Sequence, residues 1–295
     1  MYDIEKYYQA VSVQDAVRAL SEDEKAVVIS GGSDVLIQIR EGRLAGCSLV
    51  SIHGIPELNG IERTADGEVI IRAATVFSHI ANNPIILETM PMLAYAVDQV
   101  GGPQIRNIGT IGGNVCNGVT SADSASSLWA LNAVLELTGK NGVRQVPIRE
   151  FYTGPGKTVR THDEILTAIR IARADYEGFG GCYLKYGKRE AMEIATLGCA
   201  AMAKLSPDRK SLAELRLAYG VAAPTPMRCT ATEQAVCGVP INTELFDRIA
   251  QGAQGEVKPR SSWRASREFR LQLVGELARR AVQQAIQNAG GETDV

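Results

Sequence analysis

Arg106-Asn107-Ile108-Gly109-Thr110-Ile111-Gly112-Gly113-Asn114 is the stretch that decides the fold of this chain. It places three glycines within five residues, and Ser121-Ala122-Asp123-Ser124-Ala125 follows with a candidate helix start at Asp123 or Ser124. Glycine permits positive φ, and its missing side chain lets backbone N–H groups approach an anion closely. Such a loop is either a structural turn or a phosphate cradle, and a second glycine-rich stretch favours the cradle.

The second stretch is Gly31-Gly32-Ser33-Asp34, between the β-branched run 26–30 and the apolar segment 35–40. A strand, a double glycine, a hydroxyl and an acid before a helix are typical of nucleotide sites, although Asp34 can simply cap that helix. The pattern is neither the Walker sequence nor the Rossmann G-x-G-x-x-G. Two separate glycine loops predict one extended diphosphate held from two sides, which suits a dinucleotide such as FAD.

Composition limits the classes of partner. The chain has 295 residues, enough for two domains, and its net charge of -2 indicates neither a nucleic acid nor an anionic membrane as partner. No apolar run approaches the roughly 20 residues of a membrane span. Met1-Tyr2-Asp3-Ile4-Glu5 lacks the basic start and apolar core of a signal peptide. We therefore expect a cytoplasmic protein.

The cysteines and histidines do not form a recognisable metal motif. No C-x-x-C pair occurs, and His53, His79 and His162 are scattered, so we expect no metal site and no iron–sulfur cluster on this chain. The cysteines are predicted to be reduced and mostly small core residues. They are Cys47, Cys116, Cys182, Cys199, Cys229 and Cys237.

Hydrophobic patterning predicts two successive α/β units before residue 175. In the first, Ser12 caps a short helix and strands cover 26–30 and 48–52, which gives a β-α-β alternation. In the second, Thr75 caps a helix through Ile80, and one apolar-striped helix runs from Pro84 to Val100. Its strands are 69–72, 164–171 and a hairpin of 133–137 with 143–148, and a Gly/Pro loop covers 151–158.

Residues 172–182 are glycine-rich and polar and mark a boundary. After it, segments 182–186, 197–205 and 215–221 predict three antiparallel strands, and the proline-containing run 222–226 ends the sheet. Apolar residues from Phe269 to Ile286 recur at steps of three and four, which predicts one long helix packed on the core. Gly290-Gly291 then ends that helix.

With these motifs in order, the chain resembles the FAD-binding subunits of molybdenum hydroxylases, the family of the CO dehydrogenase medium subunit, and within it the bacterial xanthine dehydrogenase group. The resemblance implies an α+β fold with a two-subdomain FAD-binding domain of the PCMH or vanillyl-alcohol oxidase type. This domain would cover 1–175, with subdomains of about 1–57 and 58–175. A CO dehydrogenase flavoprotein C-terminal domain, a three-stranded antiparallel sheet with helices, would cover 176–295. The segments that carry the resemblance are 31–35, 109–114, 121–125, 151–158, 185–186, 193–195 and 260–266.

The resemblance also implies the cofactor-binding residues. Segment 28–35 would line the diphosphate and adenosine, 110–114 the diphosphate, and Asn117 and Asp123 the ribityl chain and flavin. Asp123 is equally well placed as an N-cap, and Lys185 in a strand would ordinarily be solvated. The resemblance instead implies that Lys185 contacts the cofactor, and our hypothesis is that its positive charge tunes the flavin potential. The implied set is Val28, Ile29, Ser30, Gly31, Gly32, Ser33, Asp34, Val35, Gly109, Thr110, Ile111, Gly112, Gly113, Asn114, Asn117, Asp123, Leu166 and Lys185.

The function implied is electron transfer within a hetero-oligomer. A large molybdopterin subunit would oxidise a purine such as xanthine, and a small subunit with [2Fe–2S] clusters would pass electrons to FAD bound non-covalently here. NAD⁺ would be the final acceptor, and no side chain of this chain would act as a catalytic acid or base. The alternatives are the same role with CO, an aldehyde or another N-heterocycle as the substrate, or a flavin-binding module without catalysis.

Overall fold

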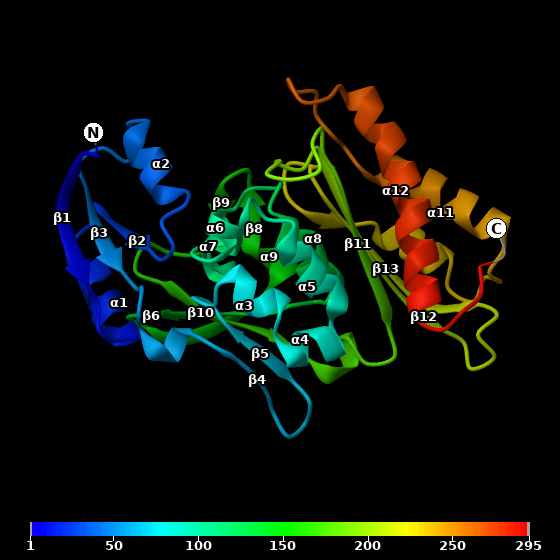
Figure 1. Ribbon diagram of the computed structural model, residues 1–295, viewed down its shortest axis with the longest axis horizontal. Helices are drawn as coiled ribbons and strands as arrows, with labels where there is room; N and C mark the ends of the chain where they lie inside the picture. The colour runs from blue at the N-terminus through cyan, green and yellow to red at the C-terminus, as the bar shows by residue number, and fades with distance from the viewer. Residues whose placement is uncertain (1, 294–295) are drawn as a thin grey trace.

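The computed structural model describes residues 2–293. Its N-terminal part is a three-stranded parallel sheet in the order β1-β3-β2, with α1 and α2 in the crossovers (Figure 1). Ser12 caps α1 by accepting a hydrogen bond from the Asp15 N–H, as predicted. The elements are β1 (Ile4–Gln9), α1 (Val13–Glu22), β2 (Ala26–Ile29), α2 (Val35–Arg40) and β3 (Cys47–Ser51), followed by a 3-10 turn at Pro56–Leu58.

The second sheet has five antiparallel strands in the order β4-β5-β10-β6-β7. The predicted hairpin is present as β6 and β7, with Lys140 and Asn141 at its turn. Strand β4 was not predicted, because a strand of three residues, two of them exposed, is too short to show a clear periodicity. The strands are β4 (Ile61–Arg63), β5 (Val69–Arg72), β6 (Val134–Gly139), β7 (Gly142–Pro147) and β10 (Ile165–Ile171).

Short helices cover this sheet, and two predictions about them were wrong. The helix expected from Pro84 to Val100 is two helices, because Pro91 cannot donate an N–H and starts a new helix, for which Met90 is the N-cap. Thr75 does not cap α3, whose N-cap is Val76. The helices are α3 (Phe77–Ala81), α4 (Pro84–Thr89), α5 (Pro91–Asp98), α6 (Pro103–Arg106), α7 (Ile111–Cys116), α8 (Asp123–Ala130) and α9 (Ile148–Phe151).

Segment 151–158, expected to be a loop, includes a small hairpin of β8 (Tyr152–Gly154) and β9 (Lys157–Thr158). A 3-10 turn at Arg173–Asp175 then leads to the third sheet.

The third sheet is antiparallel with the order β11-β12-β13-β14, so the predicted three strands are joined by a fourth. The chain returns to the sheet edge after the proline-containing run, and Met227–Arg228 pairs with Ala218–Tyr219. Two residues are too few to show a period of two, and this is why the sequence did not reveal them. The elements are β11 (Gly180–Tyr186), β12 (Leu197–Leu205), β13 (Leu212–Gly220), β14 (Met227–Arg228), α10 (Thr230–Ala235), α11 (Thr243–Glu256) and α12 (Arg267–Asn288).

Helices pack on both faces of the third sheet. On one face α12 buries Leu273, Val274, Leu277 and further residues of the predicted stripe, and Gly290 ends that helix at positive φ. Phe269, at the start of the stripe, is an exception because its ring is partly exposed. On the other face Tyr183, Ala200, Met202 and Ala218 join the core of the second sheet, and α5 and α8 lie between the two sheets.

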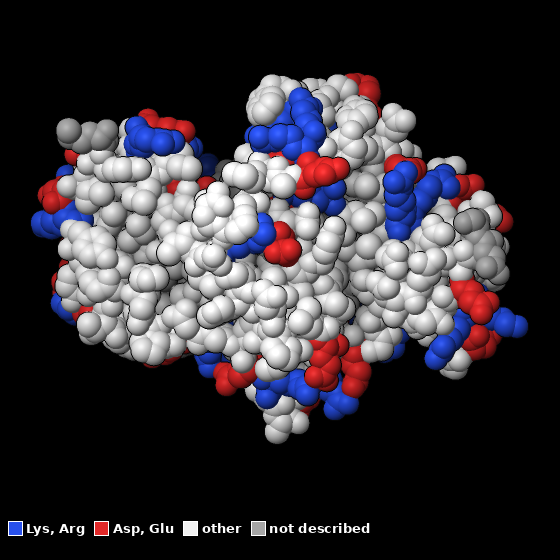
Figure 2. Space-filling view, in the orientation of Figure 1, with Lys and Arg blue, Asp and Glu red and all other residues white. Residues whose placement is uncertain are grey.

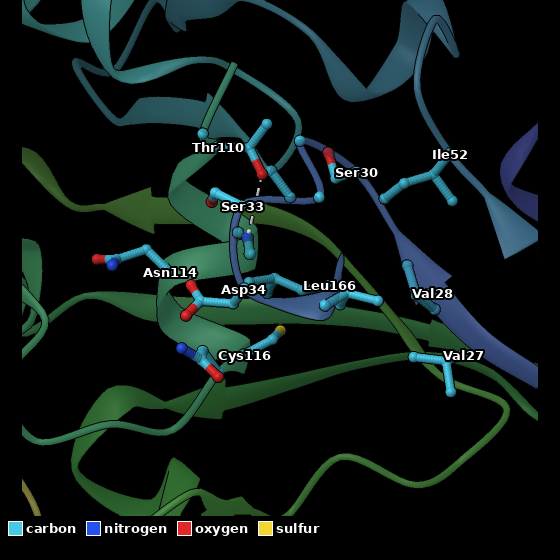
Figure 3. A pocket seen from close by; sticks show the side chains of 18 of the residues that line it. Val27, Val28, Ser30, Ser33, Asp34, Ile52, Thr110, Asn114, Cys116 and Leu166 are labelled. Carbon is cyan, nitrogen blue, oxygen red and sulfur yellow. Dashed lines mark hydrogen bonds between the residues drawn. The ribbon is translucent and has the colours of Figure 1, made fainter. Parts of the chain in front are cut away.

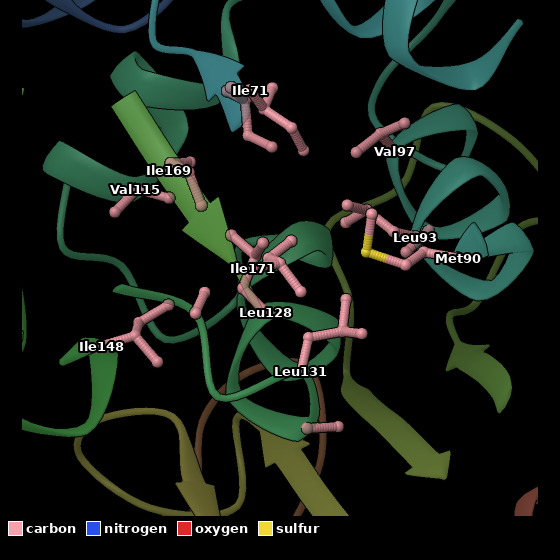
Figure 4. Packing of buried hydrophobic residues seen from close by; sticks show 14 of the residues in the cluster. Ile71, Met90, Leu93, Val97, Val115, Leu128, Leu131, Ile148, Ile169 and Ile171 are labelled. Carbon is pink, nitrogen blue, oxygen red and sulfur yellow. The ribbon is translucent and has the colours of Figure 1, made fainter. Parts of the chain in front are cut away.

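The central core packs the second sheet against α5, α7 and α8. Figure 4 shows Ile71, Ile169 and Ile171 of the sheet facing Leu93, Val97 and Leu128 of the helices. All six side chains are buried, and α7, which carries Gly112 and Gly113, packs on β10 of the same sheet. This placement sets the position of segment 106–114.

Candidate cofactor site

The two glycine loops predicted to act together touch each other. Gly31 packs directly on the backbone of the second loop, and a Cβ at Gly31 would overlap the carbonyl oxygen of Ile108 and lie 3.1 Å from the Gly109 Cα. Glycine is therefore required at Gly31 by close approach of another backbone. Gly32 has φ of 74°, so the second glycine supplies the left-handed turn into α2.

The first loop leaves its backbone N–H groups without protein acceptors. Within the described residues, no N–H from Gly31 to Asp34 donates a hydrogen bond to the chain. Asp34 occupies the N-cap position of α2, yet its side chain makes no capping hydrogen bond. Unpaired N–H groups next to a glycine turn are the donors that anionic oxygens require. This loop can therefore bind an anion with its backbone.

The second loop is different, because most of its N–H groups already donate within the chain. The N–H groups of Gly109, Ile111 and Gly112 donate to the carbonyls of Ile105, Thr75 and Ala73. Gly113 donates to the Thr110 Oγ1, which caps α7, and Asn114 donates to the Thr110 carbonyl. The glycines here serve packing, since a Cβ on Gly112 would lie 2.6 Å from the Ala73 carbonyl oxygen. The loop can offer side chains to a ligand.

A cavity of about 550 Å³ runs between the two loops. In Figure 3 Ser33, Asp34 and Asn114 lie toward one end, and Val27, Val28 and Ile52 lie toward the other. Its size and its mixed lining fit a ligand with a polar and an apolar end. Fourteen residues of the predicted set line it, namely Val28, Ser30, Gly31, Gly32, Ser33, Asp34, Val35, Gly109, Thr110, Gly112, Gly113, Asn114, Asn117 and Leu166.

Four residues of the predicted set do not line this cavity. Ile29 and Ile111 are instead buried in the core, as expected for apolar side chains. Asp123 and Lys185 lie outside the cavity lining and contact each other, with 2.9 Å between the Lys185 Nζ and the Asp123 Oδ2. The predicted tuning of a flavin by Lys185 stays a prediction.

Asp123 does not cap α8, since Ala122 is the N-cap and the carboxylate turns inward. It accepts hydrogen bonds from the Tyr183 hydroxyl at 2.7 Å and from Lys185, whose amine also donates to the Gln99 carbonyl at 2.9 Å. Burial raises the pKa of the Asp123 carboxyl, and the Lys185 amine opposes that shift. Lys185 is thus a buried, paired cation rather than a solvated one.

Sequence reasoning missed several lining residues. Ile52, Phe77 and Gly101 belong to distant segments, and nothing in their local patterns connects them to a glycine loop. His162 lines the cavity and its Nε2 lies 3.0 Å from the Leu20 and Asp23 carbonyls, so it joins the 160s loop to the end of α1. The Gly/Pro loop 151–158, one of the segments that carry the resemblance, contributes Gly156 to the lining.

The six cysteines are the remaining candidate groups. Four of the six cysteines are buried, as predicted, while Cys116 is half-buried in the cavity wall and Cys237 is exposed. Burial raises the pKa of the Cys116 thiol to about 11, which keeps it protonated at neutral pH. Among the described helices, none is both long and apolar enough to cross a bilayer.

Comparison with known proteins agrees with this architecture. Residues 2–173 match the family described as the FAD binding domain in molybdopterin dehydrogenase, and residues 182–285 match the CO dehydrogenase flavoprotein C-terminal domain. The putative xanthine dehydrogenase FAD-binding subunit of Escherichia coli (strain K12) is 43% identical over 99% of both chains. The carbon monoxide dehydrogenase medium chain of Hydrogenophaga pseudoflava is 30% identical over 95% of this chain and 96% of that chain.

The solved structure of carbon monoxide dehydrogenase from Hydrogenophaga pseudoflava has a TM-score of 0.92 and 30% sequence identity, with 98% of this chain and 99% of that chain covered. The likeness thus extends over all three sheets, and the glycine loops lie within the matched FAD-binding region. The chain belongs to the family of FAD-binding medium subunits of molybdenum hydroxylases.

Proposed function

We propose that this chain is the FAD-binding electron-transfer subunit of a xanthine dehydrogenase, and that NAD⁺ is its acceptor. The observation that carries the proposal concerns the backbone N–H groups from Gly31 to Asp34, which have no acceptor in the part of the chain that the structure describes and lie on a loop that lines the cavity between the two glycine loops. The 43% identity to the Escherichia coli subunit supports the choice of substrate group.

The residues present fit FAD. The N–H groups of the first loop and the Ser33 hydroxyl would hold the diphosphate, and Thr110 and Asn114 would face it from α7. Val27, Val28 and Ile52 form an apolar end suited to the adenine ring. When bound, FAD supplies the two-electron chemistry, accepting electrons one at a time and delivering a hydride. The chain's own residues bind and orient it, and none is proposed as an acid or base.

The proposal includes a complex. A large molybdopterin subunit would oxidise the purine, and a small subunit with [2Fe–2S] clusters would deliver the electrons. We also propose that this hetero-oligomer is cytoplasmic and that it acts in purine catabolism. We also propose a division into an FAD-binding domain at 1–175, with subdomains of about 1–57 and 58–175, and a C-terminal domain at 176–295.

Two alternatives follow from specific observations. The glyceraldehyde dehydrogenase medium chain of Sulfolobus acidocaldarius is 30% identical over 93% of this chain, so the same role with an aldehyde, CO or another N-heterocycle is the second candidate. A flavin-binding module without catalysis is the third, because every feature of the site described above concerns binding.

Anaerobic titration tests the proposal. The purified chain is loaded with FAD and desalted, and its absorbance is then followed as NADH is added. Retained flavin bands that bleach with NADH support both FAD binding and the NAD⁺ half-reaction. Retained flavin that NADH does not reduce would exclude NAD⁺ as the acceptor. Loss of flavin, even from a chain co-expressed with the large and small subunits, would refute the cofactor assignment itself.

A further inference from the structure

The cavity between the two glycine loops has one fixed cation in its lining, and the binding scheme above does not use it. Among the lining residues that the structure describes, Arg160 is the only lysine or arginine. Asp34 and Glu164 are the acidic residues of that lining. The diphosphate of a dinucleotide adds further negative charge, and like charges brought together in a cavity repel each other. The charge balance of the occupied cavity therefore depends on Arg160.

The two carboxylates of the lining are not equivalent. Glu164 is already balanced by Arg144, which lies outside the lining and places donors 2.5 Å and 2.8 Å from the two carboxylate oxygens. Asp34 has no ion pair within residues 2–293, and its side chain makes no capping hydrogen bond. An anion held by the first loop would therefore lie near an uncompensated carboxylate, and a cation of the cavity is needed to offset it.

The Arg160 guanidinium is anchored through one nitrogen and unused at the others. Its Nη1 donates to the Glu164 carbonyl at 2.7 Å and to the Thr161 carbonyl at 3.0 Å. In the part of the chain that the structure describes, its Nε and Nη2 donate to no acceptor, and no carboxylate pairs with it. The side chain is half-buried. A guanidinium fixed in this way keeps donors free for a ligand oxygen, in the planar arrangement that suits phosphate.

The charge of Arg160 reaches the wall of the cavity that α7 forms. Burial raises the pKa of the Cys116 thiol, and the positive charge of Arg160 opposes that shift. Cys116 is the last residue of α7, and in Figure 3 it lies on the same side of the cavity as Asp34 and Asn114. This is the polar side, where the diphosphate is proposed to lie. Arg160 can therefore act on the charged part of the ligand.

Surface charge on the visible face of the molecule does not replace this cation. Figure 2 shows Lys and Arg side chains mostly along the outline of that face, interspersed with Asp and Glu, and few over the short helices in the middle. The whole chain has a net charge of -2. Attraction of an anionic ligand must therefore come from groups at the site itself, and Arg160 is such a group.

We propose that Arg160 pairs with the diphosphate of the bound dinucleotide and makes the cavity select a phosphorylated adenosine over a neutral nucleoside. This inference rests on the proposed function, because it takes the cofactor class from it. Nη1 would stay on the two carbonyls, and Nε and Nη2 would donate to phosphate oxygens. Asp34 makes the cation necessary, and the N–H groups of the first loop supply the remaining donors.

Competition between FAD and two smaller ligands tests the inference. ADP and adenosine share the base and the ribose, and only ADP carries a diphosphate. Each is used to displace FAD from the full-length chain, followed by flavin fluorescence. Arg160→Met should raise the dissociation constant of ADP about tenfold, the effect of one charge-assisted hydrogen bond, and change that of adenosine less than about twofold. The salt dependence of FAD binding should also weaken, because one ionic contact is lost.

Two further variants separate charge from structure. Arg160→Lys keeps the charge but loses the planar fork, so its preference for ADP over adenosine should stay closer to that of the native chain. A preference as low as that of Arg160→Met would overturn the inference. Arg149→Met is the matched control, because Arg149 lies outside the cavity lining, with a side chain that is 74% exposed. It removes the same charge and should leave the ADP preference unchanged.

The outcomes distinguish this inference from the proposed function. Equal weakening of ADP and adenosine in Arg160→Met would assign Arg160 to the fold of its loop or to the adenine ring, and would overturn the inference. Native affinity for FAD and ADP in that variant would overturn it as well, while leaving the proposed function intact. A native chain that binds no FAD would refute the proposed function, and this inference with it.

Discussion

The Lys185 amine and the Asp123 carboxylate lie 2.9 Å apart, and both side chains are almost completely buried. Asp123 begins α8, and Lys185 belongs to β11, 62 residues later. The Tyr183 hydroxyl and the Gln99 carbonyl complete the hydrogen bonding of the pair. The pair therefore joins the third sheet to the helices that pack between the sheets.

Lys185→Met should destabilise the chain by about 3 kcal/mol, because it leaves the Asp123 carboxylate buried and unpaired. Lys185→Met with Asp123→Asn should recover most of that loss, since no buried charge is left. If Lys185 also tunes the flavin, the midpoint potential should fall in the single variant and return toward the native value in the double variant, which removes one charge of each sign. Denaturant unfolding gives the stability, and a dye-coupled titration of the FAD-loaded chain gives the potential. Unchanged potential and flavin affinity would remove the tuning role and leave a structural ion pair.

Gly31→Ala adds one methyl group to the first loop. We expect it to weaken FAD binding more than a methyl group added at any other position of that loop. The new Cβ overlaps the Ile108 carbonyl, so the two glycine loops must separate. We expect a loss of about 2 kcal/mol in stability and at least a tenfold rise in the FAD dissociation constant.

The control is Gly154→Ala, where a Cβ meets nothing within 4 Å and φ is not positive. Flavin fluorescence titration and thermal unfolding of both variants make the comparison. Equal FAD affinity in the two variants would contradict the importance of contact between the loops.

The Glu164 carboxyl makes the free energy of unfolding of the chain depend on pH in the acid range. Arg144 holds the pKa of this carboxyl down at about 2, with donors 2.5 Å and 2.8 Å from its two oxygens, and the Thr161 N–H adds a third bond. Because the folded pKa is depressed, the stabilisation is complete above the unfolded value of about 4.3 and is lost as pH falls toward 2.

Glu164→Gln should therefore lose about 2 kcal/mol at neutral pH, a figure reduced because Arg144 is partly solvated. The variant should also unfold with less dependence on pH between about 4.3 and 2. Urea unfolding at several pH values measures both effects. A slope in that interval identical to that of the native chain would show that another carboxylate is responsible.

Arg216 connects the third sheet to the rest of the chain. Its buried guanidinium lies 3.0 Å from the Asp175 carboxylate and 2.7 Å from Glu214, and it donates to the Ala130 carbonyl. Arg216→Met should cost about 3 kcal/mol, because these acceptors lose their buried donor. Arg280→Met, which removes an exposed pair with Glu276, should cost less than about 0.5 kcal/mol. Calorimetry of the two variants checks the difference, and equal losses would contradict the connecting role of Arg216.

Much of the fold was predictable because its signals are local. The Ser12 cap, the β6–β7 hairpin and the stripe of α12 follow from turn chemistry and side-chain period, and each is present. The errors also have local causes. The apolar stripe continues across 84–100 without a break, but Pro91 divides this segment into two helices. Strand β14 has two residues, which are too few to show the alternation of a strand.

By itself, the sequence determined the order and type of the main elements, the two glycine loops and the family, because each is written in a contiguous run of residues. Only the tertiary structure decided what the glycines do. Gly31 admits the backbone of a loop 77 residues away, whereas the N–H groups at Gly109, Gly112 and Gly113 are already used within the chain. It also decided that Asp123 pairs with Lys185 rather than capping α8. In each case the outcome depends on packing, which brings together groups that are far apart in the sequence. A local pattern of residues does not show which of these groups will come within hydrogen-bonding distance.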